Sequence, residues 1–221
     1  MILTIEIGNS TITLGGVEGD EIRFECRINT DRVKTSDTYC IDLKTLFEIY
    51  GIELSAIEGV IIASVVPQVL NSVRTAIRKL LNLEPLIVGP GLKTGLDIRL
   101  DNPAAMGAGL VAADVAALAE YKPPLIIIDM GTATTMSVLD PNGAHLGGCV
   151  CPGLKISLDA LTSRTSLLPG IQLDSPDRAV GRSTADAPLE HIDEQGVEQA
   201  VENAAGAHAD HGNFCAALTA Q

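Results

Sequence analysis

Aromatic residues and positive charge are both scarce in this chain of 221 residues. Phe, Trp and Tyr make up 3% of it and Trp is absent, so a core must be built from Ile, Leu, Val and Ala. Against 28 Asp and Glu there are 15 Lys and Arg, a net charge of −13. This balance argues against binding to nucleic acid or an anionic membrane, because both need clustered basic side chains. A polyanionic ligand would need local donors and a cation.

Long apolar runs and regularly spaced cysteines are missing as well. No apolar stretch approaches the roughly 20 residues that span a bilayer. The start of the chain, Met1 to Glu6, has no basic residue and reaches a carboxylate at once, unlike a signal peptide. The five Cys are odd in number and irregularly spaced, which is typical of free thiols in a reducing compartment. We therefore expect a cytoplasmic protein without a membrane segment.

One short motif occurs twice. Residues 6–11 read EIGNST and residues 129–134 read DMGTAT. Each has a carboxylate at the end of an apolar strand, a glycine two residues later and a threonine five residues later. The glycine lets the backbone approach a ligand closely, turn N–H groups and hydroxyls can donate to phosphate oxygens, and the carboxylate can hold a cation. A single copy is more typical of an ordinary hairpin turn, but two copies predict a site that holds a polyphosphate from both sides.

The segments around the two motifs have the same order, which predicts an internal duplication. Each motif joins two strands, and a third strand and a helix follow. The predicted strands are 2–7, 11–18 and 20–29 in the first copy, and 125–129, 133–139 and 144–151 in the second. Between the copies we predict helices at 36–50, 68–83 and 105–120 and strands at 59–66 and 85–88. This is an α/β pattern of two similar lobes with a cleft between them.

The composition changes near residue 185. From Ser183 to the end there are seven acidic residues and no Lys or Arg. We predict lobes at 1–115 and 116–185 and a weakly helical or disordered tail at 186–221 that does not complete the second lobe.

Two groups of possible metal ligands have a simpler interpretation. Cys149 and Cys151 share one face of a predicted strand, and we expect both to be small buried side chains. His208, His211 and Cys215 could bind zinc, but no fourth ligand lies nearby in a regular spacing and we interpret them as part of a solvated tail.

Five separated motifs, taken together, resemble type III pantothenate kinases in order and spacing over roughly residues 1–185. They are residues 6–11, Asn102-Pro103 with Gly107-Ala108, residues 129–135, Gly147-Gly148 with Pro152-Gly153, and residues 181–184. The family belongs to the sugar kinase, Hsp70 and actin superfamily. The resemblance therefore implies two duplicated ribonuclease-H-like lobes with a nucleotide cleft, the second lobe being truncated here.

The resemblance also implies an activity and its ligands. The expected reaction is transfer of a phosphoryl group from ATP to pantothenate, the first step of coenzyme A synthesis, in a homodimer, with magnesium and a monovalent cation (potassium or ammonium). The implied nucleotide-binding positions are Glu6, Gly8, Asn9, Ser10, Thr11, Gly131, Thr132, Ala133 and Thr134. The implied substrate positions are Leu100, Gly107, Ala108, Gly109, Leu110 and Thr184. Asp129 corresponds to the monovalent-cation ligand, and Glu6 would hold magnesium indirectly.

The chain departs from the family pattern where the family does its chemistry. Gly109 replaces the aspartate that serves as general base, and Leu110 replaces an arginine that helps bind pantothenate. Leu100 replaces a tyrosine, and Glu6 replaces the usual aspartate. Asp101 is a candidate substitute base. Three alternatives stay open: a kinase with impaired catalysis, a non-catalytic sensor that binds nucleotide or pantothenate, and an inactive fragment. The atypical tail also makes the homodimer an open question.

Overall fold

The computed structural model describes residues 1–166 and 215–220 and divides into two compact units. The first unit comprises residues 1–94 and 104–112, and the second comprises residues 95–103 and those from 113 onward. The division falls inside the helix α3 (Ala108–Glu120). Within the described residues, no helix has the length and apolar character needed to cross a bilayer.

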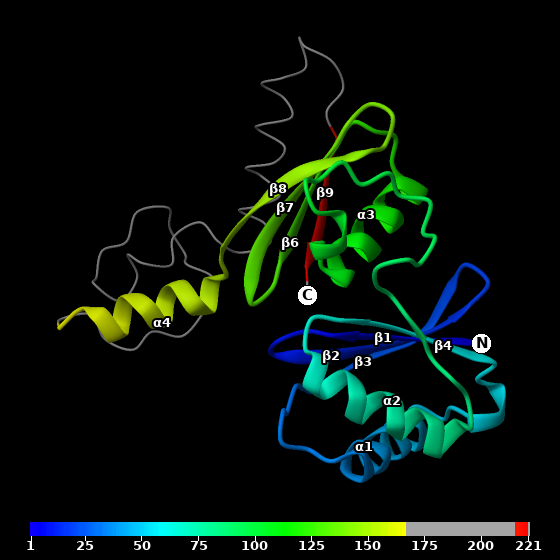
Figure 1. The fold of residues 1–221 in the computed structure, drawn as a ribbon. Helices are drawn as coiled ribbons and strands as arrows, with labels where there is room; N and C mark the ends of the chain where they lie inside the picture. The colour runs from blue at the N-terminus through cyan, green and yellow to red at the C-terminus, as the bar shows by residue number, and fades with distance from the viewer. Residues whose placement is uncertain (167–214, 221) are drawn as a thin grey trace. The chain divides into compact units, whose positions relative to one another are not determined.

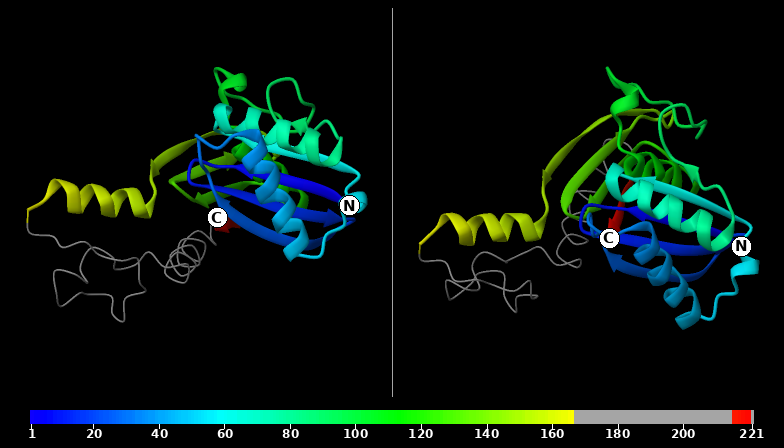
Figure 2. Two further views of the ribbon diagram at one scale, coloured as in Figure 1. Left: turned by 90° about the horizontal axis from the view of Figure 1, so that it is seen from below. Right: turned by 60° about the horizontal axis from the view of Figure 1, so that its bottom comes forward.

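A five-stranded sheet forms the first unit, and two helices lie side by side on one of its faces (Figures 1 and 2). Its strands are β1 (Ile2–Ile7), β2 (Thr11–Glu18), β3 (Glu21–Asn29), β4 (Gly59–Ser64) and β5 (Leu86–Ile87), in the order β3-β2-β1-β4-β5. The helices are α1 (Ser36–Ile49) and α2 (Pro67–Leu81), and a short 3₁₀ turn, η1 (Leu54–Ala56), precedes β4. The first three strands are antiparallel, whereas β1, β4 and β5 run parallel.

Apolar side chains at alternate strand positions and at helical spacing fill the core of this unit. Leu3, Ile5 and Ile7 of β1 are buried together with Tyr39, Leu43 and Phe47 of α1 and Val69, Val73 and Ile77 of α2. Successive strand residues point to opposite faces, and helix positions four apart share a face. Glu6 therefore lies on the face of the sheet opposite the two helices.

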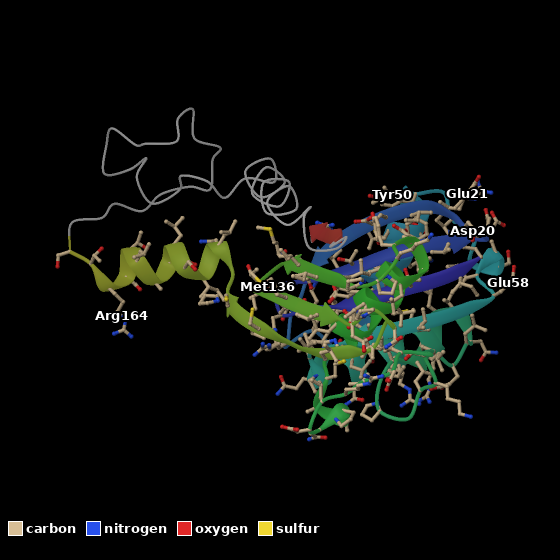
Figure 3. All side chains as sticks on the ribbon, turned by 90° about the horizontal axis from the view of Figure 1, so that it is seen from above. Asp20, Glu21, Tyr50, Glu58, Met136 and Arg164 are labelled. Carbon is tan, nitrogen blue, oxygen red and sulfur yellow. The ribbon has the colours of Figure 1, made fainter. Side chains whose placement is uncertain are left out.

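The few aromatic residues join β3 to α1. The Phe24 ring lies 6.4 Å from the Phe47 ring and 5.7 Å from the Tyr50 ring, between centroids. Tyr50 lies toward the same end of the sheet as Asp20, in the β2–β3 turn, and Glu21, the first residue of β3 (Figure 3). Aromatic contacts of this kind contribute beyond their buried area, so even a chain poor in aromatics uses them at this edge of the core.

The second unit repeats the strand arrangement of the first. Its sheet has the order β8-β7-β6-β9, with β6 (Leu125–Met130), β7 (Ala133–Leu139), β8 (His145–Pro152) and β9 (Cys215–Ala220). The pairs β6–β7 and β7–β8 are antiparallel and β6–β9 is parallel, as in β1–β2, β2–β3 and β1–β4. The predicted duplication is therefore confirmed, and it extends to the fourth strand of each sheet.

That fourth strand corrects the prediction for the tail. Cys215–Ala220 is neither helical nor disordered, because β9 pairs along its whole length with β6, from Leu125 and Cys215 to Met130 and Ala220. A parallel ladder satisfies backbone N–H and C=O groups whatever the side chains are, so pairing with β6 is enough to hold this segment as a strand. The remaining tail predictions, including those for His208 and His211, lie outside the described residues.

Helix α3 covers one face of the second sheet, where Ala117 packs with Leu125, Ile127 and Leu139. Helix α4 (Leu154–Arg164) follows β8 as predicted. Figure 3 shows Arg164 near its end and Met136 on β7.

The expectation that Cys149 and Cys151 are buried is wrong. Both thiols are exposed on β8, because β8 is an edge strand of the sheet and the two side chains share one of its faces. Among the described residues they join no group of three metal-binding side chains.

Candidate functional site

The first motif forms a tight turn between β1 and β2, which we call the first acidic turn (residues 6–11). Ile7 pairs with Ile12, and the Gly8 N–H donates to the Thr11 carbonyl across the turn at 2.9 Å. A Cβ atom at Gly8 would lie 3.1 Å from that carbonyl and 3.5 Å from a Glu6 carboxylate oxygen. A side chain at position 8 would therefore fit tightly, and the carboxylate of Glu6 lies close to the turn.

Two residues after β3 support this turn, and sequence reasoning missed both. The Thr30 hydroxyl donates to the Gly8 carbonyl at 2.7 Å, and the Thr30 N–H donates to the Ser10 carbonyl at 2.9 Å. The Arg32 guanidinium donates to the Asn9 side-chain oxygen at 3.2 Å. The only signal in the sequence is position. Both residues follow β3, which pairs with β2, and the last residue of β3 lies opposite Thr11, the first residue of β2.

The second motif forms the corresponding turn between β6 and β7, the second acidic turn (residues 129–134). It is one residue shorter, since only Gly131 and Thr132 separate the two strands. It rests against the start of α4, where the Gly153 N–H donates to the Thr132 carbonyl at 3.1 Å. A Cβ at Gly153 would lie 2.2 Å from the Gly131 carbonyl oxygen and 2.5 Å from that of Thr132. Only glycine permits this approach.

Beside the second acidic turn, two buried oxygen atoms have no hydrogen-bond partner. They are Oδ1 of Asp129 and Oγ1 of Thr135, and the two residues are directly opposite on β6 and β7, so their side chains share a face. Burial raises the pKa of the Asp129 carboxyl. Buried polar oxygens without a partner are costly, and hard cations take oxygen ligands. The pair therefore fits the monovalent cation that the sequence implied at Asp129.

The predicted substrate positions are divided between the two units. Gly107, Ala108, Gly109 and Leu110 belong to the first unit, at the start of α3, and Leu100 belongs to the second. A Cβ at Gly109 would meet nothing within 4 Å. Thr184 lies outside the described residues, and Asp101, the substitute base considered above, is exposed.

A buried polar cluster in the second unit was not predicted. Oδ2 of Asp114 on α3 lies 2.7 Å from Nδ1 of His145 on β8, and Asp114, Ser137 and His145 are 0%, 2% and 3% exposed. Burial raises the pKa of Asp114, and the hydrogen bonds from His145 and Ser137 oppose that rise. The cluster ties α3 to β7 and β8. The signal for this cluster in the sequence is Asp114, the only charged residue of α3 before the terminal Glu120.

Each acidic turn thus has a carboxylate, a glycine that allows close packing, and supporting groups that orient its carbonyls. Such turns can receive an anion on N–H groups and hydroxyls while the carboxylate holds a cation. The start of α3 has no carboxylate or guanidinium at positions 109 and 110. The two turns therefore have the groups that a phosphate site uses, whereas position 109 has no side chain that could remove a proton.

Comparisons with known proteins identify the family. The sequence pattern of the family "Type III pantothenate kinase" matches residues 2–192. A type III pantothenate kinase of Exiguobacterium sp. strain AT1b is 43% identical over 187 residues, which cover 85% of this chain and 74% of that protein. One of Geobacillus thermodenitrificans is 42% identical, covering 85% and 72%.

A solved structure bears on the fold alone. It is named a 2-dehydro-3-deoxygalactonokinase protein from Sinorhizobium meliloti, with a TM-score of 0.56 and 12% identity, and the match covers 100% of this chain and 91% of that one. This likeness to a sugar kinase agrees with the predicted α/β fold of ribonuclease-H-like lobes.

Proposed function

The chain belongs to the type III pantothenate kinase family, a family of phosphotransferases, and from that premise we propose that it transfers the γ-phosphoryl group of ATP to the primary hydroxyl of pantothenate. The bond from the γ-phosphorus to the β–γ bridging oxygen breaks, a bond to the pantothenate oxygen forms, and ADP and 4′-phosphopantothenate result. The observation that carries the proposal is the repetition of one acidic turn at the same place in two sheets that share a four-strand arrangement.

Each turn has a distinct part in binding the nucleotide. The first acidic turn, with Gly8 and Asn9 at its tip, binds phosphate oxygens through N–H groups and hydroxyls. The second, with Gly131 and Thr132, binds phosphate oxygens through the same kinds of group. Glu6 would hold magnesium indirectly, and Asp129 with Thr135 would hold potassium or ammonium. When bound, these cations offset the negative charge of the triphosphate, because a protein of net charge −13 would otherwise repel it.

The proposal predicts that catalysis is impaired but not abolished. Phosphoryl transfer depends mainly on positioning and electrostatic stabilisation, so the hydroxyl proton can pass to water when position 109 offers no base. A missing general base costs about 10²- to 10⁴-fold in rate. Leu110 also weakens the binding of the pantothenate carboxylate, because a charge-assisted hydrogen bond of roughly 1.5–3 kcal/mol is lost.

The decisive experiment is a coupled assay of ADP release with and without pantothenate and potassium. Release that depends on pantothenate supports the kinase; release that does not depend on it contradicts the proposed acceptor.

A second candidate is a nucleotide or pantothenate sensor without turnover. The observation that favours it is the contrast between the supported turns and the empty space at Gly109. Isothermal titration with millimolar magnesium-ATP separates this candidate from an inactive protein, because a sensor binds the nucleotide saturably although no ADP forms.

A further inference from the structure

We propose that Arg32 is a phosphate-binding residue of the first acidic turn, positioned for that purpose by Thr30 and Tyr39. The inference rests on the proposed function, because it presumes that this turn receives the phosphates of a nucleotide. The residues concerned follow β3 and belong entirely to the first unit. None of them is among the motif residues that the sequence singled out.

Thr30 fixes the direction of the turn's carbonyl groups. Its hydroxyl and its N–H occupy the carbonyl oxygens of Gly8 and Ser10, and the Gly8 N–H occupies that of Thr11. A carbonyl oxygen that points at a phosphate would repel it. Because protein donors hold these carbonyl oxygens, the other face of the turn is available to bind the anion. Thr30 therefore prepares the turn for a negatively charged ligand.

Tyr39 fixes the segment that carries Arg32. The ring of Tyr39 is buried in the core and 1% exposed, and its hydroxyl donates to the Asp31 carbonyl at 2.7 Å and accepts from the Asp31 N–H at 3.1 Å. The Asp31 carboxylate in turn accepts from the Val33 N–H at 2.9 Å. Arg32 thus extends from a backbone held on both sides, although its own side chain is exposed.

The charge of Arg32 is not neutralised within the described residues. Seven of the nine basic side chains in residues 1–94 pair with a carboxylate. Arg32 and Lys93 have no such pair among the described residues, and Arg32 instead donates to the neutral oxygen of Asn9 in the first acidic turn. In a chain with almost twice as many acidic as basic residues, an unpaired guanidinium at a phosphate turn is well suited to bind the anion, since arginine matches phosphate geometry.

The test compares Arg32→Gln with Arg27→Gln in the full chain. Both substitutions remove one positive charge, and Arg27 is an exposed residue of β3 whose partner is Glu25. Binding of ATP is measured by titration, and binding of adenosine by competition. Arg32→Gln should weaken ATP roughly tenfold to a hundredfold, as the loss of a charge-assisted hydrogen bond predicts. It should leave adenosine unchanged and reduce the salt dependence of ATP binding, whereas Arg27→Gln should match the wild type.

Several outcomes would overturn the inference: equal ATP binding by the two variants, an equal loss for ATP and adenosine, or no ATP binding by the wild type. Arg32→Lys keeps the charge and should recover part of the affinity. Thr30→Val should weaken ATP without changing the net charge, with Thr45→Val, an exposed helix residue whose hydroxyl bonds only its own helix, as its matched control.

Pantothenate-dependent ADP release is measured separately on the wild type. If ATP binding depends on Arg32 but no transfer occurs, this inference stands and the proposed reaction fails.

Discussion

Introducing an aspartate at position 109 tests most directly the proposal that this chain is a slow kinase because it lacks a general base. Gly109 lies in the first turn of α3, and a Cβ there meets nothing within 4 Å, so the new side chain has room. Glycine is a poor helix residue, and a carboxylate in the first turn interacts favourably with the helix dipole by about 0.3–1 kcal/mol. Gly109→Asp should therefore fold at least as stably as the wild type.

The expected gain in rate follows from the chemistry of the missing group. A positioned general base contributes about 10²- to 10⁴-fold, which corresponds to roughly 3–5 kcal/mol of activation free energy. Gly109→Asp should raise kcat within this range and leave KM for ATP unchanged. Adding Leu110→Arg should then lower KM for pantothenate by roughly tenfold to a hundredfold, because the guanidinium pairs with the substrate carboxylate.

A coupled ADP assay measures both effects, and Gly109→Asn is the control. Asparagine has nearly the same size and helix propensity but cannot accept the proton. If the Asp and Asn variants have equal rates, proton removal at position 109 does not limit the reaction, and the interpretation of Gly109 as the empty base position is wrong.

Three further predictions concern the second unit and are checked by urea or thermal unfolding. Asp129→Asn should raise the unfolding free energy in the absence of potassium by about 1–3 kcal/mol, since a buried unpaired carboxylate is lost, and should abolish stabilisation by added potassium; a variant still stabilised by potassium would refute the cation site. Gly153→Ala should destabilise by about 1–3 kcal/mol, because its Cβ would lie 2.2 Å from the Gly131 carbonyl, whereas Gly89→Ala, where nothing lies within 4 Å, should not. Burial raises the native pKa of Asp114 above its ordinary 3.8, so its stabilising contribution is complete below pH 3.8 and is lost as the pH rises through the native pKa. The wild type should therefore lose stability relative to Asp114→Asn as the pH rises over that range. Parallel stability curves for the two proteins would contradict the pKa assignment.

The sequence was sufficient to predict the strands and helices that turns delimit clearly. Gly8-Asn9 and Gly19-Asp20 separate three runs of alternating apolar residues, and the observed strands start and end within one residue of the prediction. The repeated acidic turn indicated the duplication, because glycine and carboxylate recur at one spacing. These features depend on neighbours in the chain, which a sequence displays directly.

The missed features depend instead on residues far apart in the chain. β9 is uncharged and rich in alanine, and only its pairing with β6, 90 residues earlier, makes it a strand. Thr30 reaches Gly8 across 22 residues, and Asp114 reaches His145 across 31. A polar residue in an apolar helix signals that a partner exists, but spacing along the chain cannot identify that partner.

Under the proposed function, the two acidic turns and position 109 differ in how the fold supports them. The nucleotide turns are each held by several groups: Thr30 and Arg32 support one, and Gly153 packs against the other. Nothing comparable surrounds Gly109, where a missing side chain leaves open space. Replacing a closely packed glycine destabilises its turn, as the contact of Gly153 implies, whereas a Cβ at position 109 meets nothing within 4 Å, so that position can change without harm to the fold. Loss of the base before loss of the phosphate turns is therefore the order that folding stability alone would favour.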